Sequence, residues 1–376
     1  MLIPMSEPDI SPAEVAAVNE VLETRWLSLG PRLEQCEAAM RAYTQSGHAV
    51  GVNSGTSGLH LTMIACGIQP EDEVISSSFS FIASANCIVY EGGKPVFVDI
   101  DLKTGNMDPS KIEAAITSRT RAIIVVDAFG QPADIDPIIA IARHHGLYVI
   151  HDSCESIGAE YKGQRARSSD AAVYAFYPNK QMTTGEGGMI TTDNPEWAML
   201  FKSLRNQGRD VFNGHLEHNR LGYNYRLDEM SAAIGNVQVG RLDELLAKRA
   251  QVADWYNAHL ETTPHVRRPY IAPTTTRMSW FVYVVQFDEG IDRDAMIAYL
   301  DQQGIPSRAY FNPIHLQPYY KDRFYYQRGD LPQTEKAGDI SLALPFSSVM
   351  THDQVNYVCD YVRRGIEKQV LTKTLR

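Results

Sequence analysis

Cysteine is scarce in this sequence, and the cysteines that are present are not arranged in pairs. The 376 residues contain five cysteines with no C-x-x-C spacing, namely Cys36, Cys66, Cys87, Cys154 and Cys359. An odd number of widely separated cysteines predicts neither a disulfide framework nor a zinc cluster. We therefore expect buried, unpaired thiols.

The histidines are not grouped as metal ligands either. His144 and His145 precede Gly146 at a predicted helix end, where polar or cationic side chains suit the helix dipole. His215 and His218 lie in a polar loop without a further ligand at matching spacing. We expect no metal site.

Basic patches and long apolar runs are also missing. The chain has 35 lysines and arginines against 45 acidic residues, a formal net charge of −10. Without a basic surface, a nucleic-acid partner is not expected. No apolar run approaches the roughly 18 residues that span a membrane, and the N-terminal segment lacks the features of a signal peptide. These absences predict a soluble, cytoplasmic protein with no membrane partner.

Strand-like and helix-like segments alternate between about residues 48 and 193. The strand-like segments are 48–55, 72–78, 94–101, 122–130, 147–154, 171–178 and 187–193, and helical patterns cover 57–67, 109–117 and 134–146. Such alternation predicts an α/β fold, with a mostly parallel central sheet covered by helices on both faces. Ligands of these sheets bind at the carboxyl ends of the strands, so residues that follow strands are site candidates.

The second part of the chain has a different pattern. A long helical segment covers 227–260 and is followed by one strand-like segment, 280–287, and by helical patterns at 291–304 and 352–368. We therefore predict two domains: a large α/β domain over 1–245 and a smaller C-terminal α+β domain over 246–376.

A candidate phosphate site follows the first predicted strand. In HAVGVNSGTSGLHLT, a small-residue turn leads into a helix, so Gly55, Thr56 and Ser57 present backbone N–H groups at a helix N-terminus. An ordinary capped helix start accounts for the same residues. The motif alone leaves both interpretations open.

Three further residues lie in or just after strands. Asp152 ends a mostly apolar strand, where a carboxylate needs a positive partner such as a protonated heterocyclic nitrogen, unless it only caps a helix. Lys180 follows AAVYAFYP and precedes a glycine cluster, and Phe81 lies in a serine-rich loop. A phosphate cradle, an acid, a stacking ring and a lysine amine are the groups that hold pyridoxal 5′-phosphate as a Schiff base.

The sequence resembles the DegT/DnrJ/EryC1/StrS family of sugar aminotransferases along nearly its whole length. The resemblance is carried by TRWLSLGP, VNSGTSGLHL, SFSFIASAN, PVFVDID, VIHDSCESIGA, FYPNKQMTTGEGGM, LGYNYRLDEMSAAIG and RAYFNPIHLQPYY. It implies the fold type I architecture of pyridoxal-phosphate enzymes (aspartate aminotransferase-like) and a transaminase activity.

The resemblance also implies roles for individual residues. Lys180 would be the covalent and catalytic residue, and Asp152 would pair with the pyridine nitrogen. The implied cofactor contacts are Gly55, Thr56 and Ser57 at the phosphate, Phe81 over the ring, Glu155 near the phenolic oxygen, and Asn224 at the phosphate of the other subunit. The last contact implies a homodimer with shared active sites. Ala175 departs from the family, because many relatives have a phosphate-binding serine there.

The implied reaction moves an amino group from glutamate to a nucleotide-linked keto sugar. The block RAYFNPIHLQPYY resembles that of GDP-perosamine synthases, which favours a 4-keto sugar and amino sugar biosynthesis for a surface polysaccharide, such as a lipopolysaccharide O-antigen, or a natural product. The candidate substrate contacts are Trp26, Ser28, Arg226, Arg308, Tyr310 and His315. A structural role for His315 and a surface role for Arg226 are alternatives.

Other functions share these motifs. A cyclitol aminotransferase would differ only in its substrate, and a cofactor-binding regulator would bind the same cofactor without turnover. Dehydratases of this family have histidine in place of the lysine, so the presence of Lys180 argues against a dehydratase function. The sequence does not distinguish GDP-, dTDP- and UDP-linked sugars.

Overall fold

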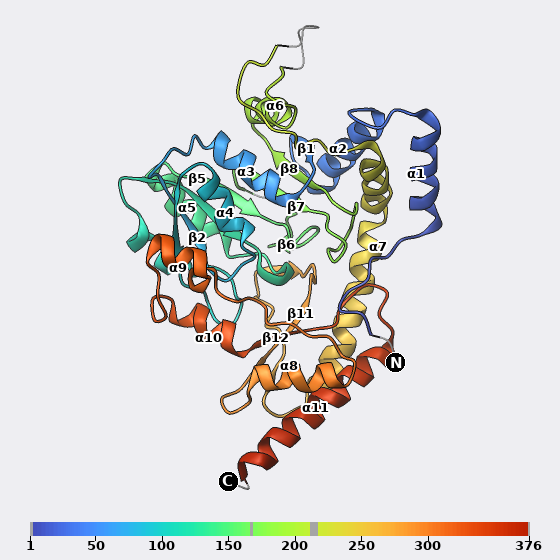
Figure 1. Cartoon of the computed structure of the whole chain (residues 1–376), viewed down its shortest axis with the longest axis vertical. Helices are drawn as coiled ribbons and strands as arrows, with labels where there is room; N and C mark the ends of the chain where they lie inside the picture. The colour runs from blue at the N-terminus through green and yellow to red at the C-terminus, as the bar shows by residue number, and fades with distance from the viewer. Residues whose placement is uncertain (1–2, 166–167, 211–216, 375–376) are drawn as a thin grey trace.

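The computed structural model describes residues 3–165, 168–210 and 217–374 (Figure 1). A seven-stranded sheet organises the larger part of the chain, in the order β1-β8-β7-β5-β4-β2-β3. Its strands are β1 (His48–Val52), β2 (Glu73–Ser77), β3 (Lys94–Val98), β4 (Thr120–Val126), β5 (Tyr148–Asp152), β7 (Ala171–Ala175) and β8 (Gly188–Thr192). In this sheet β8 runs opposite to the other six strands, which confirms the predicted, mostly parallel α/β sheet.

Helices cover both faces of this sheet, as the alternating sequence predicts. The helices of the larger part are α1 (Pro12–Thr24), α2 (Pro31–Thr44), α3 (Gly55–Ala65), α4 (Ala83–Tyr90), α5 (Ile135–His145) and α6 (Pro195–Leu204). Apolar residues of α3, α4 and α6 pack with one face of the sheet, which includes Val52 and Ile124. Residues of α2 and α5 pack in clusters on the other face, with Ala49 and Ile123 respectively. The sheet is therefore buried on both sides.

One predicted helix forms differently. Residues 109–117 make only two short 3₁₀ turns, η1 (Pro109–Lys111) and η2 (Glu113–Ala115). The N–H of Ile112 donates to Pro109 O at 3.2 Å, and that of Ile116 donates to Glu113 O at 3.3 Å. A segment this short is marginal as an α-helix, and Thr117 is instead held by the Thr120 hydroxyl at 2.9 Å.

A continuous helix, α7 (Glu229–Leu260), connects the larger part to the smaller one (Figure 1). Leu245 and Leu246 of α7 pack in a core shared with β7 and β8, whereas Val252 and Tyr256 pack in the smaller core. The predicted domain boundary at 245 and 246 thus falls inside a helix. Ile3, which the prediction places in the large domain, also packs in the smaller core.

The smaller core is built on a three-stranded antiparallel sheet in the order β12-β11-β9. Its strands are β9 (Val266–Arg267), β11 (Tyr283–Phe287) and β12 (Ser341–Leu344), and α8 (Arg293–Gln302) and α11 (His352–Thr374) pack in this core. The helix α9 (Pro318–Phe324) packs instead with Ala85 and Phe97 of the larger part, and α10 (Pro332–Ile340) packs with Phe79 and Ile100. The remaining short elements are β6 (Glu160–Tyr161), β10 (Thr275–Arg277), η3 (Ala128–Gly130) and η4 (Ile314–Leu316). Among the described residues, no helix is long and apolar enough to cross a lipid bilayer.

Candidate active site

A cavity of about 650 Å³ lies at the carboxyl ends of β4, β5 and β7. Seven of the predicted site residues line it: Gly55, Thr56, Phe81, Asp152, Glu155, Lys180 and Tyr310. The first six come from the larger part of the chain and Tyr310 from the smaller. The structure therefore brings together in one cavity residues that are far apart in the sequence.

Lys180 lies in the loop between β7 and β8, and its side chain is 13% exposed. Its Nζ atom is 3.8 Å from Glu155 Oε1 and 3.9 Å from the centroid of the Phe281 ring. The backbone N–H of Lys180 donates to Tyr177 O at 2.9 Å, which fixes the turn that follows β7. The amine thus sits between a carboxylate and an aromatic face that limits access of water.

Asp152 is the last residue of β5 and is 6% exposed. Its Oδ2 accepts from the Ser84 hydroxyl at 2.7 Å, and its Oδ1 accepts from the Cys154 N–H at 3.2 Å. Within the described ranges, no lysine, arginine or histidine forms an ion pair with this carboxylate. A buried carboxylate needs a positive partner to stay ionised, and a protonated pyridine nitrogen fits that requirement.

The N-terminus of α3 forms the wall of the cavity at Gly55 and Thr56. A Cβ atom on Gly55 would lie 2.7 Å from Ala175 Cβ and 2.8 Å from Cys154 Sγ, so only glycine lets the turn pack this closely on the strand ends. The open N–H groups of such a turn suit a phosphate. Ala175 lines the same cavity and offers no hydroxyl there.

Ser57 does not line this cavity. Its N–H donates to Ser54 Oγ at 3.0 Å, and its hydroxyl donates to Asn53 Oδ1 at 2.6 Å. Both groups are used in capping α3, so the geometry favours Gly55 and Thr56 over Ser57 as phosphate ligands.

Phe81 and Glu155 provide two further chemical features. The Phe81 side chain is 63% exposed, so its ring is available for stacking on a planar group. Burial raises the pKa of the Glu155 carboxyl to about 6, although the Lys180 charge and the Phe129 N–H, 2.9 Å from Oε2, act to lower it. The negative charge of Asp152 acts to raise it further.

The contacts of His315 fit the structural alternative for this residue better than a substrate contact in this cavity. Its side chain is fully buried outside the cavity lining, with Nδ1 2.7 Å from Ser78 Oγ and Nε2 3.2 Å from Glu335 Oε1. Burial lowers the pKa of His315, and Glu335 opposes this shift. Both ring nitrogens are engaged within the protein, so His315 holds η4 in place and does not reach the cavity.

Five other predicted residues lie outside the cavity of their own chain. Trp26, Ser28, Asn224 and Arg308 are exposed on the surface, and Arg226 is half-buried. The Trp26 indole donates to Ser28 O at 2.9 Å, and Arg226 donates to the side chains of Asn206 and Gln207 at 3.1 and 2.8 Å. The described side chains contain no cluster of three or more potential metal ligands; His215 lies outside them.

Several cavity residues were missed by the sequence reasoning. They are Tyr177, Asn179, Phe281, Asn312 and Gln317. Tyr177 and Asn179 follow β7 directly, so the rule that strand ends form the site was a sufficient signal for them. Phe281 belongs to a strand-like apolar run that reads as core, and nothing in the run marks its position beside Lys180.

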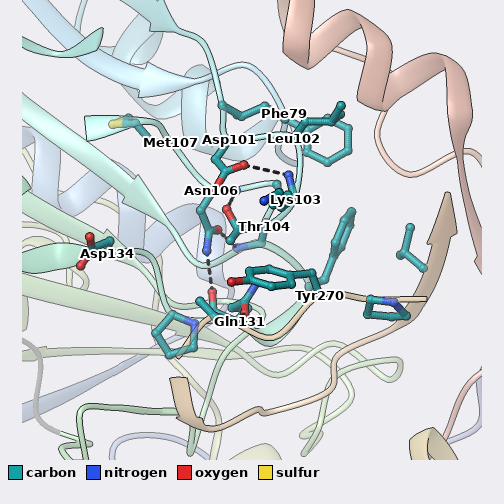
Figure 2. A pocket seen from close by; sticks show the side chains of 18 of the residues that line it. Phe79, Asp101, Leu102, Lys103, Thr104, Asn106, Met107, Gln131, Asp134 and Tyr270 are labelled. Atoms are coloured by element: carbon teal, nitrogen blue, oxygen red, sulfur yellow. Dashed lines mark hydrogen bonds between the residues drawn. The ribbon is translucent and has the colours of Figure 1, made fainter. Parts of the chain in front are cut away.

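A second and larger cavity, of about 800 Å³, lies between the loop that follows β3 and residues near Tyr270 (Figure 2). Its lining contains none of the predicted site residues. Phe79 and Phe129 line it and also pack against Phe311, which lines the first cavity. These aromatic rings lie between the two cavities, and the predicted chemistry is confined to the smaller one.

Replacing Glu155 by Gln is expected to change the pH dependence of stability. Glu155 has a pKa of about 6 in the folded chain against 4.5 ordinarily, so its protonated form stabilises the fold at low pH. This contribution is lost as pH rises through that window, by about 2 kcal/mol. Urea unfolding of the cofactor-free proteins at pH 4.5 and 7.5 measures the difference. If Glu155→Gln loses as much free energy of unfolding between pH 4.5 and 7.5 as the wild-type protein does, the raised pKa of Glu155 is contradicted.

Comparison with known proteins shows the family of this chain. Residues 8–363 match the DegT/DnrJ/EryC1/StrS aminotransferase family. GDP-perosamine synthase of Caulobacter vibrioides is 40% identical over 95% of this chain and 96% of that protein. The spore coat polysaccharide biosynthesis protein SpsC of Bacillus subtilis is 38% identical over 96% of both chains.

The fold agrees with that of solved relatives. The crystal structure of S. venezuelae DesV in complex with a ketimine intermediate has a TM-score of 0.89 at 35% identity, and the match covers 96% of this chain and 98% of that chain. The fold type I architecture is thereby confirmed. The chain therefore belongs to the DegT/DnrJ/EryC1/StrS aminotransferase family and is a pyridoxal-phosphate-dependent sugar aminotransferase.

Proposed function

We propose that this enzyme moves an amino group from glutamate to the keto carbon, at C4, of a nucleotide-linked keto-deoxy sugar. The observation that carries the proposal is the 40% identity to a GDP-perosamine synthase over 95% of the chain. The cavity volume of about 650 Å³ supports it, because the cavity has room for a substrate beside the cofactor. The products are 2-oxoglutarate and the amino sugar nucleotide.

The residues of the cavity fit pyridoxal phosphate. When bound, the cofactor supplies an electron sink for the carbanion that forms when a proton leaves the carbon bearing nitrogen. In this proposal Lys180 would hold the cofactor covalently, and its amine, once free, would accept and return the proton of the reacting carbon. Asp152 would pair with the protonated ring nitrogen, and Phe81 would stack on the ring.

The remaining contacts orient and shield the reaction. Gly55 and Thr56 would bind the phosphate, and Glu155 would lie near the phenolic oxygen. The ring of Phe281, 3.9 Å from Lys180 Nζ, excludes water from one side of the amine. Tyr310, Asn312 and Gln317 line the cavity from the smaller part of the chain and offer groups that can hydrogen-bond to sugar hydroxyls.

We also propose that two copies of the chain share their active sites. Tyr223 and Tyr225 pack edge-on against His60 of α3, and Asn224 between them remains exposed. The Asn53 N–H donates to Tyr225 O at 2.9 Å, which fixes this segment beside the phosphate turn of its own chain. The exposed Asn224 side chain would then reach the phosphate in a second copy.

The five cysteines are free, which supports a reducing compartment and hence the cytoplasm. The relatives that make perosamine and spore coat polysaccharide support a role in amino sugar synthesis for a surface polysaccharide, or for a natural product. A cyclitol aminotransferase remains the second candidate, because it would use the same lysine and cofactor contacts.

A substrate panel tests the proposed reaction. The holoenzyme is incubated with glutamate and with GDP-, dTDP- or UDP-linked 4-keto-6-deoxy sugars, the corresponding 3-keto sugars, or scyllo-inosose. We expect release of 2-oxoglutarate, with formation of an amino sugar, from at least one 4-keto sugar nucleotide. Amination of scyllo-inosose alone would replace the proposal by the cyclitol reaction, and amination of 3-keto sugars alone would overturn the C4 assignment.

Mixed dimers test the shared site. Lys180→Ala and Asn224→Ala are each expected to impair both sites of their own homodimer. In a heterodimer of the two variants, one site would combine the intact Lys180 of one chain with the intact Asn224 of the other. We expect differently tagged, copurified heterodimers to recover up to half of the wild-type activity. Activity no higher than the mean of the two homodimers would show that each site uses residues of a single chain.

A further inference from the structure

Arg249 is a buried arginine on α7 whose guanidinium donates hydrogen bonds to backbone carbonyl groups and lies 5.6 Å from the centroid of the Phe346 ring. The residue is 1% exposed. Its Nη2 donates to Lys180 O at 2.8 Å and to Asn179 O at 3.4 Å, and its Nη1 donates to Trp280 O and Phe281 O, each at 3.2 Å. In the part of the chain that is described, no carboxylate lies within ion-pair distance of this guanidinium.

A cation buried without a carboxylate is costly to the fold. Burial lowers the pKa of Arg249 to about 10, so the group remains charged at neutral pH. The charge is compensated by the carbonyl dipoles of two separate segments, 179–180 and 280–281. An apolar side chain could connect these two segments without the desolvation free energy that a buried charge requires. A purely structural connection therefore does not require an arginine.

The two segments that Arg249 holds are those that define the position of the reactive amine. Segment 179–180 carries Lys180, and segment 280–281 carries Phe281, whose ring lies 3.9 Å from Lys180 Nζ. One guanidinium therefore fixes the backbone of the lysine and the backbone of the ring that covers it. Since Phe281 belongs to the smaller part of the chain, the same contact ties that part to the catalytic loop.

We propose that Arg249 is a positioning residue for the transamination, which holds Lys180 and Phe281 in the geometry that the lysine needs as covalent partner and proton carrier. The inference rests on the proposed role of Lys180. It assigns the function to the planar fork of the guanidinium, which donates in fixed directions to four carbonyls. The ammonium of a lysine is a compact donor and cannot serve both segments in this way.

A second connection keeps the fold intact when Arg249 is changed. The Gln181 side chain donates to Glu155 O at 2.5 Å and to Ser279 Oγ at 2.7 Å, and Ser279 Oγ donates to Ile157 O at 2.6 Å. These bonds join the same two parts of the chain next to the Arg249 contacts. We therefore expect Arg249 variants to fold and to bind cofactor.

The variants Arg249→Lys and Arg249→Met separate geometry from charge. Lysine keeps the positive charge but not the fork, and methionine keeps an unbranched chain without charge. Arg293→Met is the control, because Arg293 is 9% exposed and donates to Gly338 O and Ser341 O at 2.9 Å. Unlike Arg249 it also pairs with a carboxylate, that of Asp294 at 2.6 Å, and its hydrogen bonds to described residues do not include the Lys180 loop. It reports the effect of losing a buried arginine elsewhere.

Three properties of each holoenzyme are measured. The first is thermal unfolding, and the second is the pH at the midpoint of the absorbance change of the bound cofactor in the resting enzyme. The third is kcat and KM of the half-reaction with glutamate. For both Arg249 variants we expect kcat to fall on the order of 100-fold with KM changed much less, because misplacing a reacting group by about 1 Å costs that much. In Arg249→Met, loss of a buried positive charge should also move the absorbance midpoint to higher pH. Arg293→Met should change thermal unfolding alone.

Unchanged kcat and absorbance midpoint in the Arg249 variants, with a thermal shift like that of Arg293→Met, would overturn the proposal and leave Arg249 a structural residue. Near-wild-type kcat in Arg249→Lys would contradict the role of the fork, even if Arg249→Met fails to fold. An error in the proposed sugar substrate gives a different result. In that case the wild-type holoenzyme shows no turnover with keto sugars, whereas the half-reaction with glutamate still measures the effect of the Arg249 variants.

Discussion

The register of three adjacent parallel strands is the constraint on which this active site depends. Val126 at the end of β4 pairs with Asp152 at the end of β5, and Asp152 pairs with Val173 in β7. The carboxyl ends of all three strands therefore lie side by side at one end of the sheet. This places the Asp152 carboxylate and the Lys180 loop around a common cavity, and a one-residue slip in β5 would turn Asp152 to the opposite face.

The smaller part of the chain completes the cavity. It contributes Phe281 and Tyr310, and it is attached through α7, through the buried contacts of Arg249 and through the Gln181 bond to Ser279. These contacts link the Lys180 loop to a second hydrophobic core, so the position of the lysine depends on how the two cores pack. In the proposed mechanism Lys180 serves both half-reactions, and this coupling would give its side chain a fixed starting geometry.

The sequence was sufficient to predict the strands of the main sheet and the residues that lie at their ends. Alternating apolar runs identified all seven strands, and the rule that ligands bind at strand ends led to Asp152, Lys180 and the turn at Gly55. Their roles also drew on the resemblance to a known family. The prediction worked here because these features are local and periodic.

Features that depend on packing between distant segments could not be predicted. His315 lies in a Pro-bounded, aromatic loop that resembles a substrate loop, and only the fold shows that Ser78 and Glu335 engage its ring. Nothing in the sequence singles out Phe281 or Arg249, because the amine and the carbonyls that they contact are remote in sequence. The helix predicted at 109–117 failed for a related reason, since propensity alone does not stabilise so short a segment.

The central claim is that Lys180 forms the covalent link to pyridoxal phosphate. Borohydride reduction of the resting holoenzyme, followed by proteolysis and mass spectrometry, tests it directly. The account predicts one pyridoxyl-modified peptide, with the modification on Lys180. A pyridoxyl group on another lysine, or none on any peptide of a cofactor-loaded and active enzyme, would contradict it.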